Sequence, residues 1–188
     1  GVAGTLDLTP SLLSFGGLLT KPKDCPLKAQ LNLVLKEGKE LEGDFSFWLN
    51  ELSLKGNVGH FDVSSGEGEL TFLTNKFSLN GWEKILQPFQ GYPLAGSGKV
   101  LLSVKGRLLE ADKVSYTGTI SVEEGSVQYE LFPVRDLNAT FEFSNIRASS
   151  GELSFIGGNS PFRAEFVWNM LPHPSLTVIG MAPEFHLS

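Results

Sequence analysis

Apolar and polar residues alternate along most of the chain. Between positions 27 and 35 every odd residue is apolar, and the even residues Lys28, Gln30 and Asn32 are polar, with Val34 as the exception. Successive side chains of a β-strand point to opposite faces of the sheet. The segment 27–35 is therefore predicted to be a strand with one apolar face and one mostly polar face.

The same period-two pattern recurs and predicts further strands. It is present in residues 44–47, 69–72, 100–104, 116–122, 127–131, 137–143, 162–168 and 176–178. Turn-forming residues separate these segments at 37–39, 57–59, 123–126, 157–161 and 172–174. Strands about ten residues apart, with no long helix between them, predict an all-β antiparallel meander. The alternation also indicates that each strand buries only one face.

One or two short helices are expected to interrupt the meander. Asn80 and Glu83 have the spacing of a capping box, and Pro88 is expected to end the helix that they begin, which is predicted over residues 81–87. The apolar residues that form one stripe of this helix are Trp82, Ile85, Leu86 and Phe89. A second helical turn is predicted to start at Pro10.

Composition indicates a single ordinary globular domain. The 188 residues are 41% hydrophobic and 19% charged, and the mean hydropathy is close to zero. A net charge of −6 argues against nucleic-acid binding and gives no electrostatic reason to bind anionic lipid headgroups. Fourteen phenylalanines supply apolar area without a polar group. Cys25 is the single cysteine, so no internal disulfide is possible, and we interpret it as a loop thiol.

No motif predicts catalysis, a metal site or a cofactor. The glycines of residues 91–99 have the spacing of a phosphate-binding loop, but Ser97 replaces the required lysine and a strand follows. The paired carboxylates Glu123 and Glu124 precede a glycine and are expected to be solvated turn charges. The histidines are isolated in the sequence and fit no metal-ligand spacing; they are His60, His173 and His186. We therefore expect a protein that is not an enzyme.

An ordered set of short segments resembles the C-terminal region of AsmA-like proteins. The segments are 19–27 (LTKPKDCPL), 52–56 (LSLKG), 86–89 (LQPF), 92–100 (YPLAGSGKV), 103–106 (SVKG), 116–122 (YTGTISV), 137–141 (LNATF), 158–162 (GNSPF) and 181–183 (MAP). Each segment alone is ordinary strand-and-turn sequence, and the resemblance lies in their order over nearly the whole chain.

The resemblance implies a fold, a location and a function. AsmA-like proteins are large bacterial envelope proteins, anchored in the inner membrane by one N-terminal helix and extending through the periplasm. Their taco-like β-sheets enclose a long apolar groove, and they are implicated in moving phospholipids toward the outer membrane. Residues 1–188 are accordingly expected to be one β-groove domain, curved into an open half-barrel and cut from a larger periplasmic protein. The implied partners are phospholipid acyl chains and neighbouring groove modules, with membrane contact only through parts outside this chain.

The in-phase apolar residues are the candidates for lining such a groove. They are Leu31, Leu33, Phe45, Phe47, Leu70, Phe72, Leu102, Ile120, Val122, Tyr129, Leu131, Phe141, Phe143, Phe166 and Trp168. Periodicity alone favours a closed β-sandwich, whose apolar faces pack on each other, and the resemblance favours the open groove. In the closed form the protein would be a structural or interaction module that assists outer-membrane protein assembly. A carbohydrate-binding or adhesin-like module is less favoured, because such modules use exposed Trp and Tyr and this chain has three of each.

Overall fold

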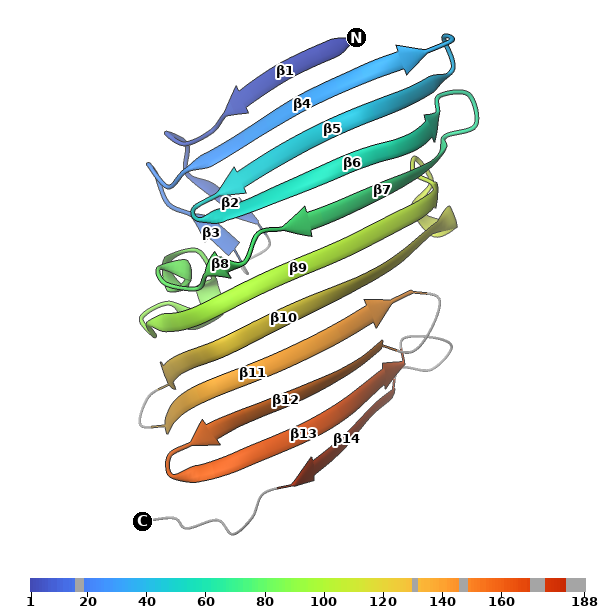
Figure 1. Cartoon of the computed structure of the whole chain (residues 1–188). Coiled ribbons are helices and arrows are strands. Elements are labelled where there is room, and N and C mark those ends of the chain that lie inside the picture. Colours follow the sequence, from blue (N-terminus) through green and yellow to red (C-terminus); the bar gives the residue numbers. More distant parts are fainter. Residues whose placement is uncertain (16–18, 130–131, 146–148, 170–174, 182–188) are drawn as a thin grey trace.

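The computed structural model describes residues 1–15, 19–129, 132–145, 149–169 and 175–181. These residues form one broad antiparallel sheet and a separate two-stranded hairpin (Figure 1). The strands of the large sheet are β1 (Val2–Asp7), β4 (Leu27–Lys36), β5 (Glu40–Leu49), β6 (Leu52–Asp62), β7 (Glu67–Thr74), β8 (Phe77–Ser78), β9 (Leu94–Arg107), β10 (Val114–Tyr129), β11 (Phe132–Ser144), β12 (Ser149–Gly157), β13 (Ser160–Asn169) and β14 (Ser175–Met181). The hairpin consists of β2 (Leu13–Phe15) and β3 (Leu19–Lys21).

The large sheet is a meander that does not close into a barrel. Its strands lie in the order β1-β4-β5-β6-β7-β9-β10-β11-β12-β13-β14, and β8 pairs with β9. Every pairing is antiparallel, and strands β1 and β14 form the two edges. The prediction of an all-β antiparallel meander that is open at its edges is confirmed. The chain forms no second large sheet among its described residues, so it does not fold into the closed sandwich that periodicity alone favoured.

Two of the predicted turns are β-bulges inside long strands. The sequence 57–59 lies within β6, where the pairing with β7 shifts by one residue between Val58 and His60. The sequence 123–126 lies within β10, so the segments predicted as two strands form one. Glu124 has a φ of 52° and Gly125 is buried there, which places the extra residue without ending the strand. Glycine and charged residues thus mark bulges here as well as turns.

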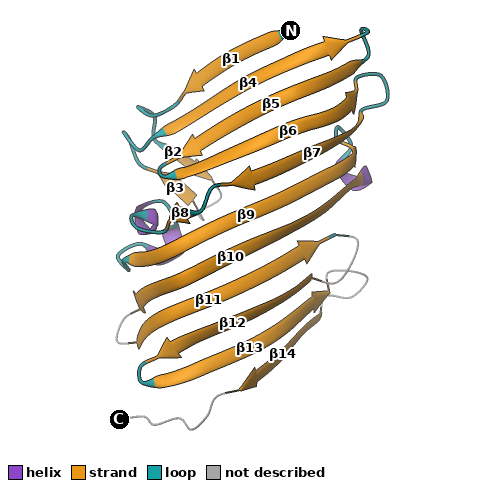
Figure 2. Ribbon diagram, in the orientation of Figure 1, coloured by secondary structure: helices purple, strands orange, loops and turns teal. Residues whose placement is uncertain are grey.

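The predicted helices are shorter than expected. The segment predicted as a helix over 81–87 contains the 3₁₀ turns η1 (Trp82–Lys84) and η2 (Gln87–Phe89), and a third, η3 (Ala111–Lys113), precedes β10 (Figure 2). The N-cap residue of η1 is Gly81, and no side chain donates or accepts a capping hydrogen bond there. The prediction of a capping box that begins at Asn80 was therefore wrong. Pro10 lies in a turn that leads to strand β2, and not in a helical turn.

A small core lies at one end of the sheet. Only six described hydrophobic side chains are buried, and five of them form one cluster: Leu27, Leu49, Phe77, Trp82 and Ile85. The β2–β3 hairpin and the segment 79–91 cover this cluster, and together we call them the cap. Its two parts are joined where the Thr20 backbone N–H donates to the carbonyl of Ile85 at 2.7 Å. Cys25 is a free, half-buried thiol that packs against this core.

Lys21 holds the hairpin in place. Its side chain is 1% exposed, and its ammonium donates to the backbone carbonyls of Thr9, Ser11 and Pro22 at 2.9, 2.6 and 2.9 Å. An ammonium has three protons, so all its donors are used. This one side chain therefore ties the two ends of the loop that carries β2 and β3 to each other.

We expect Lys21→Met to lower the free energy of unfolding by roughly 3 kcal/mol, because three carbonyls lose a charged donor inside the protein. Lys23→Met is the matched control, since Lys23 is exposed. Urea unfolding followed by circular dichroism measures both changes. Equal stability of the two variants would show that the ammonium does not hold the hairpin.

Candidate functional site

The register of the strands places most large apolar side chains on one face of the sheet, which we call the apolar face. Residues paired across antiparallel strands point to the same side. Leu31, for example, pairs with Phe45, and Ala29 pairs with Phe47, whereas the alternate residues pair Gln30 with Ser46. The same segregation holds for most pairs of strands, and the opposite face is mainly polar. The large apolar residues on that opposite face include Trp48, Leu73, Leu101, Val167 and Ile179.

Two overlapping rows of paired residues together cross the apolar face from edge to edge. The first row is Gly4, Leu31, Phe45, Gly56, Phe72, Leu102, Gly118 and Phe143, on strands β1 to β11. The second row is Val100, Ile120, Phe141, Gly151, Phe166 and Val178, on strands β9 to β14. Neither row contains a polar side chain, and the two overlap on β9, β10 and β11. At about 4.8 Å between strands the combined path is roughly 50 Å long.

Phenylalanine rings lie over glycines of neighbouring strands along this path. A Cβ atom at Gly151 would lie 2.3 Å from Cζ of Phe166, and one at Gly56 would lie 1.8 Å from Cζ of Phe45. Gly56 and Gly151 are each flanked by two rings. Phe45 and Phe72 lie beside Gly56, with their ring centroids 5.0 Å apart. The stacked rings of Phe141 and Phe166 are 5.5 Å apart beside Gly151. The rings cover the backbone where a side chain is missing, which keeps the apolar face continuous.

Much of the apolar face is accessible to solvent. Leu31 is 38% exposed, Ile120 40% and Trp168 41%. Near β1 the face is hollowed into an apolar groove of about 610 Å³ between β1, β4, β5, β6 and β7. Monomeric soluble proteins rarely expose a contiguous apolar surface of this extent unless it binds something.

Thirteen of the fifteen candidate lining residues lie on the apolar face. They are Leu31, Leu33, Phe45, Phe47, Leu70, Phe72, Leu102, Ile120, Val122, Phe141, Phe143, Phe166 and Trp168. The side chain of Tyr129 and the whole of Leu131 lie outside the described residues.

The sequence interpretation missed several residues of the same face. Leu54 pairs with Phe47, Leu153 pairs with Ala164, and the rings of Phe155 and Phe162 stack with centroids 4.8 Å apart. Short alternations such as Leu-Ser-Leu at 52–54 were the available signal. The glycines beneath the rings were not recognised, because no local pattern distinguishes them from turn glycines.

The opposite face carries ion pairs that link different strands and loops. Lys105 lies 2.8 Å from Glu69, and Lys76 lies 2.5 Å from Glu123. The hydrogen bond from Lys76 lowers the pKa of Glu123 and raises the pKa of Lys76 itself. His60, on the same face, has its Nδ1 3.8 Å from a carboxylate oxygen of Glu40. Such exposed pairs add little stability, but they keep this face hydrated.

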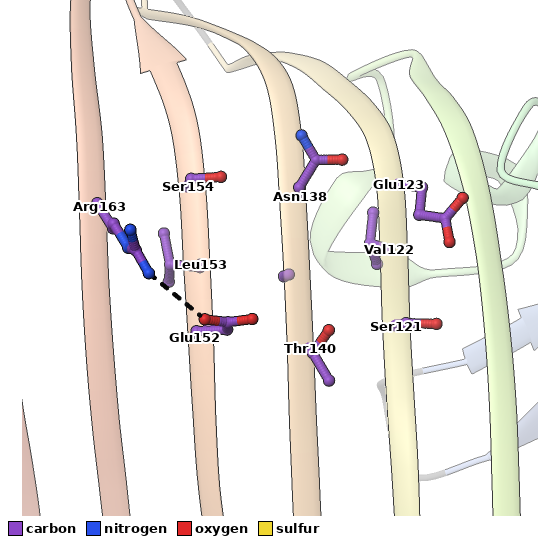
Figure 3. A pocket seen from close by; sticks show the side chains of 10 residues that line it. Ser121, Val122, Glu123, Asn138, Thr140, Glu152, Leu153, Ser154 and Arg163 are labelled. Atoms are coloured by element: carbon purple, nitrogen blue, oxygen red, sulfur yellow. Dashed lines mark ion pairs between the residues drawn. The ribbon is translucent and has the colours of Figure 1, made fainter.

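A shallow cavity of about 290 Å³ lies on the polar face over β10 to β13 (Figure 3). Hydroxyl, amide and charged side chains surround it, among them Ser121, Asn138 and Thr140. Arg163, its one cation, lies 3.8 Å from Glu152 and 3.9 Å from Glu165. Because this guanidinium already faces two carboxylates, the cavity presents no free positive charge to an anionic ligand.

The described residues show no metal-binding group of three or more His, Cys, Asp or Glu side chains. His173 and His186 lie outside them. Within the same part of the chain, no helix has both the length and the apolar character needed to span a membrane. No protein family, curated protein or solved structure matches the chain in sequence or fold comparisons.

We expect Gly151→Val to lower the free energy of unfolding by about 1–3 kcal/mol, because its side chain would collide with the ring of Phe166. Gly4→Val is the matched control on the same face, since nothing lies within 4 Å of a Cβ at Gly4. Urea unfolding of the two variants distinguishes them. If Gly151→Val is as stable as Gly4→Val, the rings do not need the glycines beneath them.

Proposed function

We propose that the apolar face binds phospholipid acyl chains, and that the protein is a non-enzymatic lipid-binding module for phospholipid transport between the inner and outer bacterial membranes. The observation that carries this proposal is the edge-to-edge apolar path, over which the described residues form no second layer. The resemblance to AsmA-like proteins supports the choice of phospholipid and of the periplasm as the location.

The energetics of a lipid in water explain why such a face is useful. Exposing an acyl chain to water costs about 0.8 kcal/mol per CH₂, so a chain of about sixteen carbons costs roughly 13 kcal/mol. Each ~1.4 kcal/mol is a factor of ten in an equilibrium, so the equilibrium population of a lipid with its chain in water is lower by about nine orders of magnitude. A continuous surface of Leu, Phe, Ile and Val replaces the bilayer interior for the chain. The polar headgroup stays in water, and no bond needs to be made or broken.

The length of the path fits transfer along the sheet. The hydrocarbon core of a bilayer is about 30 Å thick, and the path of roughly 50 Å is longer than that. No charged side chain interrupts either row, so a chain meets no desolvated charge as it moves. A continuous apolar surface allows movement without a deep energy minimum.

The two edge strands are the contact points for neighbouring modules. All six residues of β1 and all seven of β14 are exposed, and neither strand is paired on its outer side by another described strand. Unpaired backbone groups of an edge strand bind another strand by extending the ladder. Neighbouring modules paired there would prolong the apolar path beyond this chain. Strand addition at these edges is also how the alternative function, assistance to outer-membrane protein assembly, would operate.

The test introduces charge on the path. Leu31→Glu and Ile120→Glu are expected to weaken retention of a fluorescent acyl-chain probe at least about tenfold, because a charge in the path must be desolvated when a chain binds. The fold is expected to survive, since both positions are more than a third exposed. Fluorescence titration measures the binding and thermal unfolding measures the stability.

Asn32→Glu and Thr117→Glu are the matched controls. Each introduces the same charge on the same strand as its counterpart, but on the polar face. Both controls are expected to bind the probe as tightly as the unmodified protein does. In a separate measurement, mass spectrometry of the gently purified unmodified protein is expected to detect co-purified phospholipid. If the unmodified protein binds neither probe nor lipid, or the controls lose binding equally, the proposal fails.

A further inference from the structure

We propose that the end of the apolar face beneath the β2–β3 hairpin holds the methyl end of a single acyl chain, so that a bound lipid has a fixed direction. This inference rests on the proposed function and adds a specific binding site to it. The site is a pocket of about 270 Å³ between the hairpin and strands β1, β4 and β5.

The pocket is lined almost entirely by hydrocarbon. Its leucines are Leu6, Leu8, Leu13, Leu19, Leu27 and Leu49. Leu13 and Leu19 belong to the hairpin and form the wall of the pocket opposite the sheet. This wall therefore depends on the hairpin being held in place. Lys21 is the residue that holds it.

The polar groups of the pocket are already satisfied. Lys21 also lines the pocket, but its three protons are donated to backbone carbonyls. Lys28 contributes to the lining too, and its ammonium lies 3.4 Å from the carboxylate of Asp7. An occupant finds no free hydrogen-bonding group, so a peptide segment would bury its backbone amides without partners. A hydrocarbon chain needs no such partner.

The volume also selects a narrow occupant. An apolar cavity of about 150 Å³ accommodates benzene, so 270 Å³ accommodates a short stretch of alkyl chain and excludes a helix. A charged headgroup would lose its hydration in this pocket with no countercharge available to it. The methyl end of the chain is therefore the part that enters.

The pocket continues into the groove of about 610 Å³ described above. Both are lined by Leu6, Ala29 and Phe47, which form the junction between them. From this junction the groove passes Leu31 and Phe45, away from the cap. A chain with its methyl end beneath the hairpin therefore extends along β4 and β5, and its headgroup points away from the cap.

Photo-crosslinking tests this direction. Two long-chain saturated fatty acids serve as probes, one with a diazirine near the methyl end and one with a diazirine near the carboxyl end, and mass spectrometry maps the labelled residues. The methyl-end probe is expected to label the hairpin and Leu49 preferentially. The carboxyl-end probe is expected to label the groove near Leu31 and not the hairpin.

Ala29→Phe blocks the junction and keeps the surface apolar. It is expected to reduce hairpin labelling by the methyl-end probe about tenfold. Ala164→Phe is the matched control, because Ala164 also lies half-buried on the apolar face but far along the sheet, on β13. This control is expected to leave hairpin labelling unchanged, and thermal unfolding confirms that both variants fold.

The outcomes separate this inference from the proposed function. Labelling of the sheet around Phe141 and Phe166, with none at the hairpin, overturns the pocket and leaves acyl binding intact. Equal labelling of the hairpin by both probes overturns the fixed direction, as does hairpin labelling that Ala29→Phe does not change. The absence of labelling anywhere on the apolar face overturns the proposed function and this inference together.

Discussion

The antiparallel ladder determines where the apolar side chains of this protein lie. Because paired residues share a face, the register from β1 to β14 brings Leu, Phe, Ile and Val of eleven successive strands to the same side. A shift of one residue in any pairing would turn a whole strand and interrupt the path. Stability and the proposed lipid binding thus depend on the same register.

The position of the cap explains how a one-layer sheet can fold. Five buried side chains, Trp82 and Ile85 among them, form the core of the protein at one end of the strands. The rest of the sheet relies on long hydrogen-bonded ladders and on rings that lie over glycines, such as Phe166 over Gly151. Concentrating the burial at one end leaves the remaining apolar face without a covering layer among the described residues. A second layer would stabilise the domain further and would close the face.

Periodicity predicted the sheet because it is a local property, and it failed where geometry depends on distant strands. The alternation over 27–35 correctly predicted β4 and which of its residues share a face. Glu124 and Gly125 were interpreted as part of a turn, because a left-handed residue such as Glu124 occurs in bulges as well as in turns, and only the pairing with β11 tells them apart. The helix at 81–87 became 3₁₀ turns packed on the hairpin, a contact between residues more than sixty positions apart, such as Gln87 and Thr20. Periodicity could not predict that the described residues form no second layer, because an open sheet and a closed sandwich have the same pattern of apolar and polar residues.

The bulges show how the path tolerates irregular strands. Each register shift alters the twist and direction of its strand, and a shift within one of the two rows would misplace a ring. The shift in β6 lies at Val58–His60, beyond Gly56, and the shifts in β10 lie beyond Val122, away from Gly118 and Ile120. The shift in the pairing of β5 with β6, next to Gly43, and the shift in β11 likewise fall outside the rows that cross the face. The residues of both rows therefore lie in regular pairings, and the irregularities fall beside the rows, where they bend the sheet without placing a polar side chain among the rings.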